Sequence, residues 1–231
     1  MPQPWRSSSG RASSRARRSE TTTASGSASP DRLILVRHGA TGWNAEGRYT
    51  TRSDVPLSEE GIAQARAAAA ALSGEGIDRV FCSPLARARI TGETIAAAQA
   101  HGAPEMTVDE RLTEIDAGPF EGLTVAEIEA GPLAEAHARW HADRDPVAPD
   151  GAETLAAARD RAAAFFASVS DLPGTTLAAT HGSLARVLVA SVVLCADPAA
   201  HRRMWLGNCH WAVVELGSRP RLVAFNAGPA A

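Results

Sequence analysis

The chain has 231 residues, which is enough for one domain with a full hydrophobic core. Its composition, with 45% hydrophobic and 21% charged residues, is ordinary for a globular protein. The formal net charge of −3 at pH 7 provides no overall basic field for nucleic acid, and no stretch approaches the ~18 apolar residues of a membrane span. We therefore expect neither a nucleic-acid partner nor a membrane segment.

The three cysteines indicate neither a disulfide framework nor a zinc ribbon, because Cys82, Cys195 and Cys209 are odd in number and widely spaced. Cys82 and Cys195 lie in apolar runs and are expected to be buried thiols. This cysteine usage fits a reducing compartment, so a cytoplasmic location is expected.

Residues 1–30 contain mainly Ser, Thr, Ala, Gly and Arg and almost no large apolar side chains. Such a segment buries too little surface to offset its chain entropy, so we expect it to be disordered. Its basic, serine-rich character matches the crude profile of an organelle transit peptide, but an untrimmed tail or a misassigned start codon is the favoured interpretation. Residues 31–231 are expected to form the folded domain.

The first predicted strand, residues 33–36, is an apolar run that stops at Arg37, His38 and Gly39. Catalytic groups of open α/β sheets gather where strands end at the carboxyl edge of the sheet. The Arg-His pair is therefore a site candidate. A long polar loop, 40–55, follows, and loops of this length in a compact domain are usually functional.

The next segments repeat the arrangement of a strand followed by polar residues. Ser58 is the predicted N-cap of an alanine-rich helix that runs to residue 72. A short strand at 79–82 leads directly into Ser83-Pro84, which opens a second helix with Arg87 in its first turn. A helix amino terminus beside an arginine is a ready anion site.

The rest of the chain also alternates between strands and helices. We expect a weak strand at 106–108, an acidic and glycine-rich loop at 111–122, helices at 125–144 and about 154–169, a strand at 175–180 that ends in His181-Gly182, an apolar helix at 184–194, and closing, antiparallel strands at 211–214 and 222–225. This order predicts an α/β protein, a three-layer α/β/α sandwich with a mostly parallel central sheet.

Taken singly, each polar feature at a strand end is weak evidence for a site. Two histidines and two arginines, however, follow predicted strands, so that one edge of the sheet can collect all of them: Arg37, His38, Arg87 and His181. Together they would form a cationic pocket sized for one phosphoryl group.

Further motifs accompany these residues in a fixed order. They are RHGATGWN at 37–44, Gly47-Arg48, PLSEEG at 56–61, SPLARA at 83–88, Leu112-Thr113-Glu114 with Gly118 and Glu121-Gly122, GAET at 151–154, and Thr180-His181-Gly182. From about residue 32 to residue 225, the chain thereby resembles the histidine phosphatase superfamily, the phosphoglycerate mutase-like proteins, in its phosphatase branch.

The resemblance implies a phosphoglycerate mutase-like fold and an enzyme that needs neither a metal nor a cofactor. His38 would be the nucleophile that forms a phosphohistidine, and Glu114 would give a proton to the leaving oxygen and later take one from water. The phosphoryl oxygens would be bound by Arg37, Arg87 and His181, which stabilise the charge of the transition state. The expected further contacts to the phosphate are Asn44, Thr41 and Gly182.

Two departures from the family pattern bear on the reaction and the substrate. Residues 114–118 read Glu-Ile-Asp-Ala-Gly where the mutase branch typically has Glu-Arg-His-Tyr-Gly, which favours water as the final phosphoryl acceptor. Thr50 and Thr51 stand where many relatives carry Gln-Gly, which indicates a different pocket wall. The sequence predicts a phosphomonoesterase for a small metabolite, such as a sugar phosphate or a phosphoglycerate-like ester.

Other functions remain as alternatives. A phosphoglycerate mutase-type phosphotransferase is the first, and a protein-phosphohistidine phosphatase is another, which a helical cap insertion at about 118–153 would disfavour. A catalytically silent protein that binds or senses a phosphate ligand is the alternative of a different class. It is disfavoured because His38, Glu114 and His181 are all present.

Several aromatic residues and histidines complete the set of candidates. Trp43 and Tyr49 follow the first strand and are expected to contact substrate. His137 and His141 have the spacing of metal ligands on a helix, but no third ligand is apparent, so a solvated pair is favoured and no metal is expected. The sequence leaves open the oligomeric state and whether the pocket is lined by Trp140, Trp205 and His210.

Overall fold

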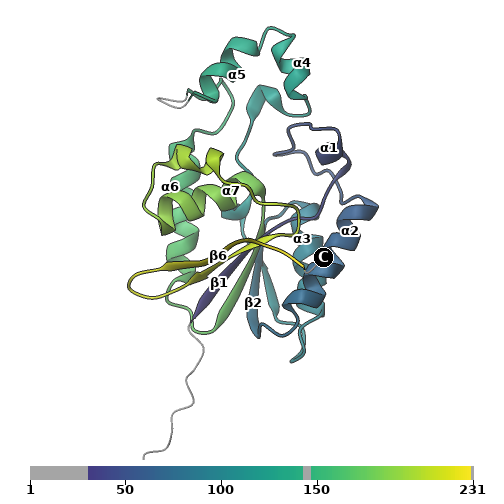
Figure 1. Ribbon diagram of the computed structural model, residues 1–231, viewed down its shortest axis with the longest axis vertical. Coiled ribbons are helices and arrows are strands. Elements are labelled where there is room, and N and C mark those ends of the chain that lie inside the picture. The colour runs from purple at the N-terminus through teal and green to yellow at the C-terminus, as the bar shows by residue number, and fades with distance from the viewer. Residues whose placement is uncertain (1–30, 143–146, 230–231) are drawn as a thin grey trace, which may run out of the picture.

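The computed structural model describes residues 31–142 and 147–229, and in it helices cover both faces of one central sheet (Figure 1). The tail that we expected to be disordered, 1–30, lies outside the described residues. Among the described helices, none has the length and apolar character needed to cross a membrane.

The strands of the sheet lie in the order β3-β2-β4-β1-β5-β6. Their bounds are β1 Arg32–Arg37, β2 Ile77–Cys82, β3 Glu105–Val108, β4 Thr175–Thr180, β5 Trp211–Glu215 and β6 Arg221–Ala227. The first four strands of this order run parallel, whereas β5 is antiparallel to β1 and β6 is antiparallel to β5. The predicted, mostly parallel sheet is confirmed.

The helices alternate with these strands along the chain. They are α1 Gly42–Ala45, α2 Glu59–Leu72, α3 Ala86–Ala97, α4 Val125–Glu129, α5 Ala134–Trp140, α6 Leu155–Val169 and α7 Gly182–Val187, which continues as a π-helix, Leu188–Val193. Short 3-10 helices span Glu110–Leu112, Gly118–Phe120 and Pro198–Arg203.

The side chains of β1 show why the molecule has three layers. Ile34 and Val36 pack with α2 and α3 in one core cluster, whereas Leu33 and Leu35 pack with α6 and α7 in the other. This alternation is the two-residue period of a strand that is buried on both faces. The predicted α/β/α sandwich is confirmed, and its middle layer holds the strands that carry the candidate residues.

The register of the two central strands places the candidate histidines side by side. Arg37, the last residue of β1, is paired with Thr180, the last residue of β4. The backbone N–H of His38 donates to the carbonyl of Thr180 at 3.0 Å, which extends the pairing by one step. His38 and His181 therefore leave neighbouring strands at the same edge of the sheet.

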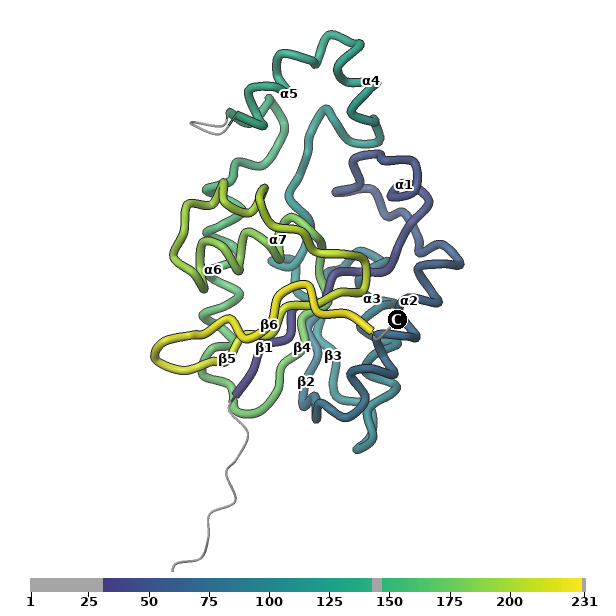
Figure 2. The backbone as a smooth tube through the Cα atoms, in the orientation of Figure 1, coloured from purple at the N-terminus to yellow at the C-terminus, as the bar shows by residue number. Residues whose placement is uncertain are grey.

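The helix predicted at 125–144 is wrong in its extent. The structure has two short helices, α4 and α5, because Gly131 and Pro132 separate them and proline has no N–H for a continuous helix. The end of the predicted range, 143–146, lies outside the described residues. Figures 1 and 2 show α4 and α5 at one end of the molecule, beyond α1 and α7.

Two smaller expectations also differ from the structure. The loop at 40–55 contains α1, whose N-cap is the side chain of Thr41. Cys195 is exposed rather than buried, because the π-helix ends at Val193 and Cys195 adopts a left-handed conformation with a φ of 51° that turns the chain away from the core. Cys82 is buried as expected.

The loop that follows His38 passes very close to the start of α2. A Cβ atom at Gly39 would overlap the carbonyl of Gly61, and a Cβ atom at Gly61 would overlap the carbonyl of Ala40. Glycine is therefore required at both positions by the close approach of two backbones. This contact fixes the path of the chain immediately after the candidate nucleophile.

We predict that Gly61→Ala lowers the free energy of unfolding by about 2 kcal/mol, because overpacking of two backbones forces them apart. Urea denaturation of the variant and of the wild type measures the loss. Gly74→Ala is the matched control, since a Cβ atom at Gly74 meets no atom within 4 Å. Equal losses in the two variants would contradict the close-contact explanation.

Candidate active site

His38 is buried at the carboxyl end of β1, with 3% of its surface exposed. Its Nδ1 lies 2.7 Å from the carbonyl oxygen of Gly39. Because a carbonyl can only accept, Nδ1 carries the ring proton and Nε2 presents a lone pair. Burial, followed by the charges of Arg37 and Arg87, holds the pKa of His38 well below its ordinary value. The ring is thus neutral and prepared for nucleophilic attack.

His181 follows β4, and its ring centroid lies 5.1 Å from that of His38. Its Nε2 lies 2.8 Å from the hydroxyl oxygen of Ser83, which also accepts from the N–H of Leu85 at 3.3 Å. The hydroxyl of Ser83 can donate its proton to His181 Nε2, and the ring proton of His181 then lies on Nδ1. Burial and nearby positive charge lower the pKa of His181 as well, since they penalise its charged form.

Arg87 lies in the first turn of α3 and is completely buried. Its two terminal nitrogens donate to the carbonyl oxygens of Ser53, at 2.7 Å, and Thr51, at 3.0 Å. Arg37, at the end of β1, donates in the same way to the carbonyl of Leu206 at 2.8 Å. Burial lowers the pKa of both arginines, but their guanidinium groups remain charged at neutral pH.

The described part of the chain contains few buried side-chain nitrogens without a hydrogen-bond partner, and three of them belong to this cluster: Arg37 Nε, Arg87 Nε and His181 Nδ1. A buried donor without an acceptor carries a cost in free energy, so such groups usually have a functional reason. An oxyanion bound among them would supply the missing acceptors.

Glu114 is buried in the loop that precedes the 3-10 helix Gly118–Phe120, and 8% of its surface is exposed. Its carboxylate accepts hydrogen bonds from the backbone N–H groups of Ser183 at 2.9 Å, Leu184 at 3.0 Å and Ile115 at 2.8 Å. These contacts hold the carboxylate over the start of α7, directly beside Gly182. Glu114 is therefore fixed in orientation by backbone groups alone.

Asn208, which precedes β5, connects the loop after His38 to the last part of the chain. Asn208 donates from Nδ2 to the carbonyl of His38 at 2.9 Å and to Asn44 Oδ1 at 3.4 Å. Asn44 Oδ1 also accepts from the N–H of Thr41, whose hydroxyl in turn caps α1. The hydroxyl of Thr41 thus has a structural partner in the N-cap of α1, and the phosphate contact of Asn44 stays a prediction.

Two adjoining cavities lie next to these groups. One has a volume of about 160 Å³ and is lined by Arg37, Glu114, Gly182, Ser183, Arg186, Trp205 and Leu206. The other, about 310 Å³, is lined by Tyr49, Thr51, Ile115, Trp140, His141, Leu155, Ser183, Arg186, His201 and Arg202. The linings of both cavities contain Ser183 and Arg186, so the two cavities lie side by side.

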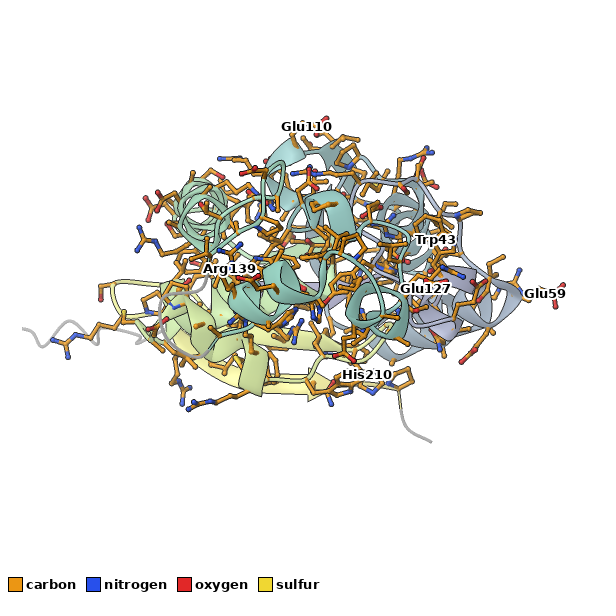
Figure 3. All side chains as sticks on the ribbon, turned by 90° about the horizontal axis from the view of Figure 1, so that it is seen from above. Trp43, Glu59, Glu110, Glu127, Arg139 and His210 are labelled. Atoms are coloured by element: carbon orange, nitrogen blue, oxygen red, sulfur yellow. The ribbon has the colours of Figure 1, made fainter. Side chains whose placement is uncertain are left out.

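The cavity linings include some of the candidate aromatic residues. Tyr49 and Trp140 line the larger cavity and Trp205 the smaller, whereas Trp43 and His210 line neither. Trp43 instead faces Gly122, and Figure 3 shows it on the same side of the molecule as Glu127 of α4. Figure 3 shows His210 at the edge of the molecule, near the strands.

The histidine pair on α5 is partly solvated, since His141 is exposed and His137 is half-buried, but both rings also contact Tyr49. The hydroxyl oxygen of Tyr49 lies 2.8 Å from His137 Nε2 and 2.9 Å from His141 Nε2. The pair therefore holds Tyr49 at the wall of the larger cavity. Within the described ranges, no group of three or more His, Cys, Asp and Glu residues is arranged to hold a metal ion.

Arg186 is a site residue that sequence reasoning missed. It lies on α7 and donates from Nε to the carbonyl of Gly182 at 2.9 Å and from a terminal nitrogen to the carbonyl of Met204 at 3.0 Å. Its spacing from His181 would have signalled it, because residues four or five positions after a strand end lie on the first turns of the following helix. Ser83 was missed in the same way, since it was interpreted only as a helix start.

Glu121 supports Arg87 from a distance. Its carboxylate accepts hydrogen bonds from the N–H groups of Thr51 at 2.9 Å and Ser53 at 2.8 Å, and from the Thr51 hydroxyl. The carbonyl groups of the same two residues accept from Arg87. Glu121 thus fixes the loop that holds the buried arginine. Burial raises the pKa of Glu121, but these hydrogen bonds outweigh it and leave the pKa below its ordinary value.

Comparison with known families agrees with this geometry. The family described as the histidine phosphatase superfamily (branch 1) matches residues 33–227. The chain belongs to this superfamily. The matched range includes all of the strands that carry the clustered residues, and the predicted family and phosphoglycerate mutase-like fold are confirmed.

Curated members of the histidine phosphatase superfamily that resemble this chain carry both phosphatase and mutase names. Phosphoserine phosphatase 1 of Hydrogenobacter thermophilus is 38% identical over 138 residues, which cover 60% of this chain and 64% of that protein, slightly less than two thirds of its length. A probable phosphoglycerate mutase of Citrobacter koseri is 36% identical over 190 residues, which cover 79% of this chain and 84% of that protein.

Solved structures from the superfamily show the same fold. A phosphoserine phosphatase from Entamoeba histolytica, in complex with 3-phosphoglyceric acid, has a TM-score of 0.74 and 26% identity over 85% of this chain and 97% of its own. A mycobacterial glucosyl-3-phosphoglycerate phosphatase in complex with VO3 has a TM-score of 0.73 and 28% identity over 85% of this chain and 99% of its own. This member of the superfamily is accordingly an enzyme of the phosphatase and mutase group.

We predict that Glu121→Gln lowers the free energy of unfolding at pH 7 by about 1–2 kcal/mol, because hydrogen bonds to a charged acceptor are replaced by weaker ones. The folded pKa of Glu121 is depressed, so the carboxylate stabilises the fold fully above the unfolded pKa of about 4.3. This stabilisation is lost as the pH falls through the folded pKa. Urea denaturation at several pH values measures the difference between variant and wild type.

The matched control for this prediction is Glu127→Gln. Glu127 lies on the neighbouring helix α4 and is 48% exposed in its side chain, where it accepts from Thr124 and pairs with Arg48. A smaller loss of stability is expected for it, because solvent screens exposed pairs. A difference between Glu121→Gln and wild type that stays constant down to pH 3 would contradict the assigned role of the carboxylate.

Proposed function

We propose that the protein is a phosphomonoesterase that hydrolyses a small phosphorylated metabolite through a phosphohistidine on His38. The observation that carries the proposal is the state of that ring: it is neutral, its Nδ1 proton is held by the carbonyl of Gly39, and Nε2 is free. The imidazole of His181 and the guanidinium groups of Arg37 and Arg87 surround it. This surrounding matches the charge of a phosphoryl group in transfer.

In the first step, His38 Nε2 attacks phosphorus, the bond from phosphorus to the ester oxygen breaks, and the leaving oxygen takes a proton from Glu114. In the second step, Glu114 takes a proton from water, the resulting hydroxide oxygen bonds to phosphorus, and the phosphorus–nitrogen bond breaks. His38 returns to its neutral state and inorganic phosphate leaves.

Side chains of the protein, without a metal ion, would stabilise the negative charge of the phosphoryl group in this mechanism. Arg37, Arg87 and His181 each present a buried nitrogen that lacks a hydrogen-bond partner among the described residues. Their donors can bind the phosphoryl oxygens and stabilise the charge that develops in the transition state. Asn44 and the backbone at Gly182 would add contacts to the same oxygens. We therefore expect activity without a cofactor.

Water as the final acceptor is supported by the segment after Glu114, Ile-Asp-Ala-Gly, which lacks the residues typical of the mutase branch. A phosphoglycerate mutase-type phosphotransferase is the second candidate, since a probable mutase is among the similar proteins. A silent binding protein is disfavoured by the complete set of His38, Glu114 and His181.

The larger cavity supports a leaving group that carries an acid, as in a phosphoglycerate-like ester. Its lining contains Arg186 and Arg202, and none of the described residues that line it carries a carboxylate. Tyr49 and His141 add polar atoms to the same wall. The similar phosphoserine phosphatase solved with 3-phosphoglyceric acid supports this class of substrate. The α4–α5 segment would cap this cavity through Trp140 and His141.

We also propose a cytoplasmic location, because free thiols, such as those of the three cysteines, are typical of a reducing compartment.

We predict that the protein hydrolyses p-nitrophenyl phosphate in excess EDTA and that His38→Ala lowers kcat by about a thousandfold or more, since it removes the nucleophile. Acid quenching with a ³²P-labelled substrate should trap an acid-labile phosphoenzyme in the wild type only. His101→Ala, at an exposed position, is the control and should retain both activity and labelling.

The outcomes separate the candidates. Labelling followed by transfer of phosphate to a second phosphoglycerate, faster than to water, would favour the mutase. Binding of phosphate esters without turnover across a panel of phosphometabolites would favour the binding protein. Activity abolished by EDTA would show that the metal-free mechanism is wrong.

A further inference from the structure

Trp205 is unusual among the aromatic residues of the described chain. It lies between the 3-10 helix Pro198–Arg203 and β5, and 71% of its surface is exposed. It also lines the smaller cavity together with Arg37 and Glu114. A large exposed aromatic ring at the mouth of a reactive site is a typical feature of ligand recognition, because covering its face removes apolar surface from water.

The backbone on both sides of Trp205 is anchored by the arginines of the site. Arg186 donates to the carbonyl of Met204 at 3.0 Å, and Arg37 donates to the carbonyl of Leu206 at 2.8 Å. Leu206 itself is buried, with 2% of its surface exposed. The exposed position of the indole is therefore not the result of a loose loop, since the residues before and after it are held in place.

The anchoring connects Trp205 to the phosphoryl end of the site. Arg37 both holds the carbonyl of Leu206 and presents its unpartnered Nε to the cluster around His38. The indole and the phosphoryl-binding groups are thus positioned by one side chain. A ligand whose phosphate lies at Arg37 would project the rest of its structure past Trp205 or into the larger cavity.

We propose that Trp205 is a specificity-determining residue that binds a ring carried by the leaving group of the phosphate ester. The inference rests on the proposed function. The flat indole offers contact to the face of a pyranose or of an aromatic ring, whereas an acyclic chain covers little of it. Arg186, at the junction of the two cavities, stands beside the same space and can bind polar substituents of the ring.

The test compares ring-bearing esters with an acyclic one. The kcat/KM values of phenyl phosphate, glucose 6-phosphate and glycerol 3-phosphate would be measured for wild type, Trp205→Ala and Trp205→Phe. We expect Trp205→Ala to lose about tenfold on a ring-bearing ester, mainly through KM, and less than twofold on glycerol 3-phosphate. Trp205→Phe should retain most of the activity, because it keeps a flat ring. The larger loss of kcat/KM in Trp205→Ala, on glucose 6-phosphate or on phenyl phosphate, shows whether the preferred ring is a sugar or an aromatic ring.

Val223→Ala is the matched control, since Val223 is also exposed, at 52%, but lies on β6 and lines neither cavity. It should leave all three kcat/KM values unchanged. Equal losses of Trp205→Ala on cyclic and acyclic esters would overturn the proposal, because they would indicate a general effect on the site. Unchanged values for Trp205→Ala on every ester would overturn it as well.

A binding measurement separates this inference from the proposed function. Phenylphosphonate and methylphosphonate bind as phosphate-ester analogues that cannot be hydrolysed, and calorimetry gives their affinities. The wild type should prefer phenylphosphonate by about tenfold, and Trp205→Ala should lose this preference. If the wild type hydrolyses nothing but shows the preference, the hydrolase proposal fails and the role of Trp205 stands. If the wild type hydrolyses esters but binds phenylphosphonate and methylphosphonate equally well, the hydrolase proposal stands and the proposed role of Trp205 fails.

Discussion

The burial of positive charge beside neutral imidazoles is the constraint on which the rest of the structure depends. Arg87 is completely removed from solvent and its terminal nitrogens are held by backbone carbonyl groups. Carbonyl dipoles satisfy the donors without neutralising the charge, so the positive field remains directed at His38 and His181. That field keeps both rings uncharged and favours an oxyanion between them. The fold carries the cost of desolvating these arginines.

The sheet positions the two histidines, and the loops position the groups around them. The in-register ends of β1 and β4 set the distance between the two histidines, and the close contact of Gly39 with Gly61 directs the chain away afterwards. The loops supply the carbonyl groups and the carboxylates. Glu114 takes its orientation from the first backbone N–H groups of α7, which are free of intrahelical partners. The strands therefore hold His38, the proposed nucleophile, whereas loops hold Glu114 and the carbonyl groups that bind the arginines.

Sequence reasoning reached the fold and the centre of the site because both follow from short-range patterns. Apolar runs that end in Arg37-His38 and in His181 mark strand ends, and strand ends converge. The patterns could not reveal the roles of Asn208 or Trp205, because their relation to the site depends on long-range contacts. The mixture of apolar and polar residues in 125–144 indicated one helix and did not reveal the break at Gly131 and Pro132. Tyr49 meets His137 only through tertiary packing.

The backbone pairing of the loop at 48–51 with the segment at 121–124 has an evolutionary consequence. Tyr49 exchanges backbone hydrogen bonds with Gly122 and Leu123, and Arg48 forms an isolated bridge with Thr124. Glu121 lies directly before this pairing and accepts from the N–H groups of Thr51 and Ser53. The pairing therefore also positions the carbonyl groups of Thr51 and Ser53, which hold Arg87. An insertion or deletion within 121–124 would shift this register and displace the carbonyl groups that hold Arg87. We therefore expect this pairing to tolerate changes of length less well than exposed loops away from the site.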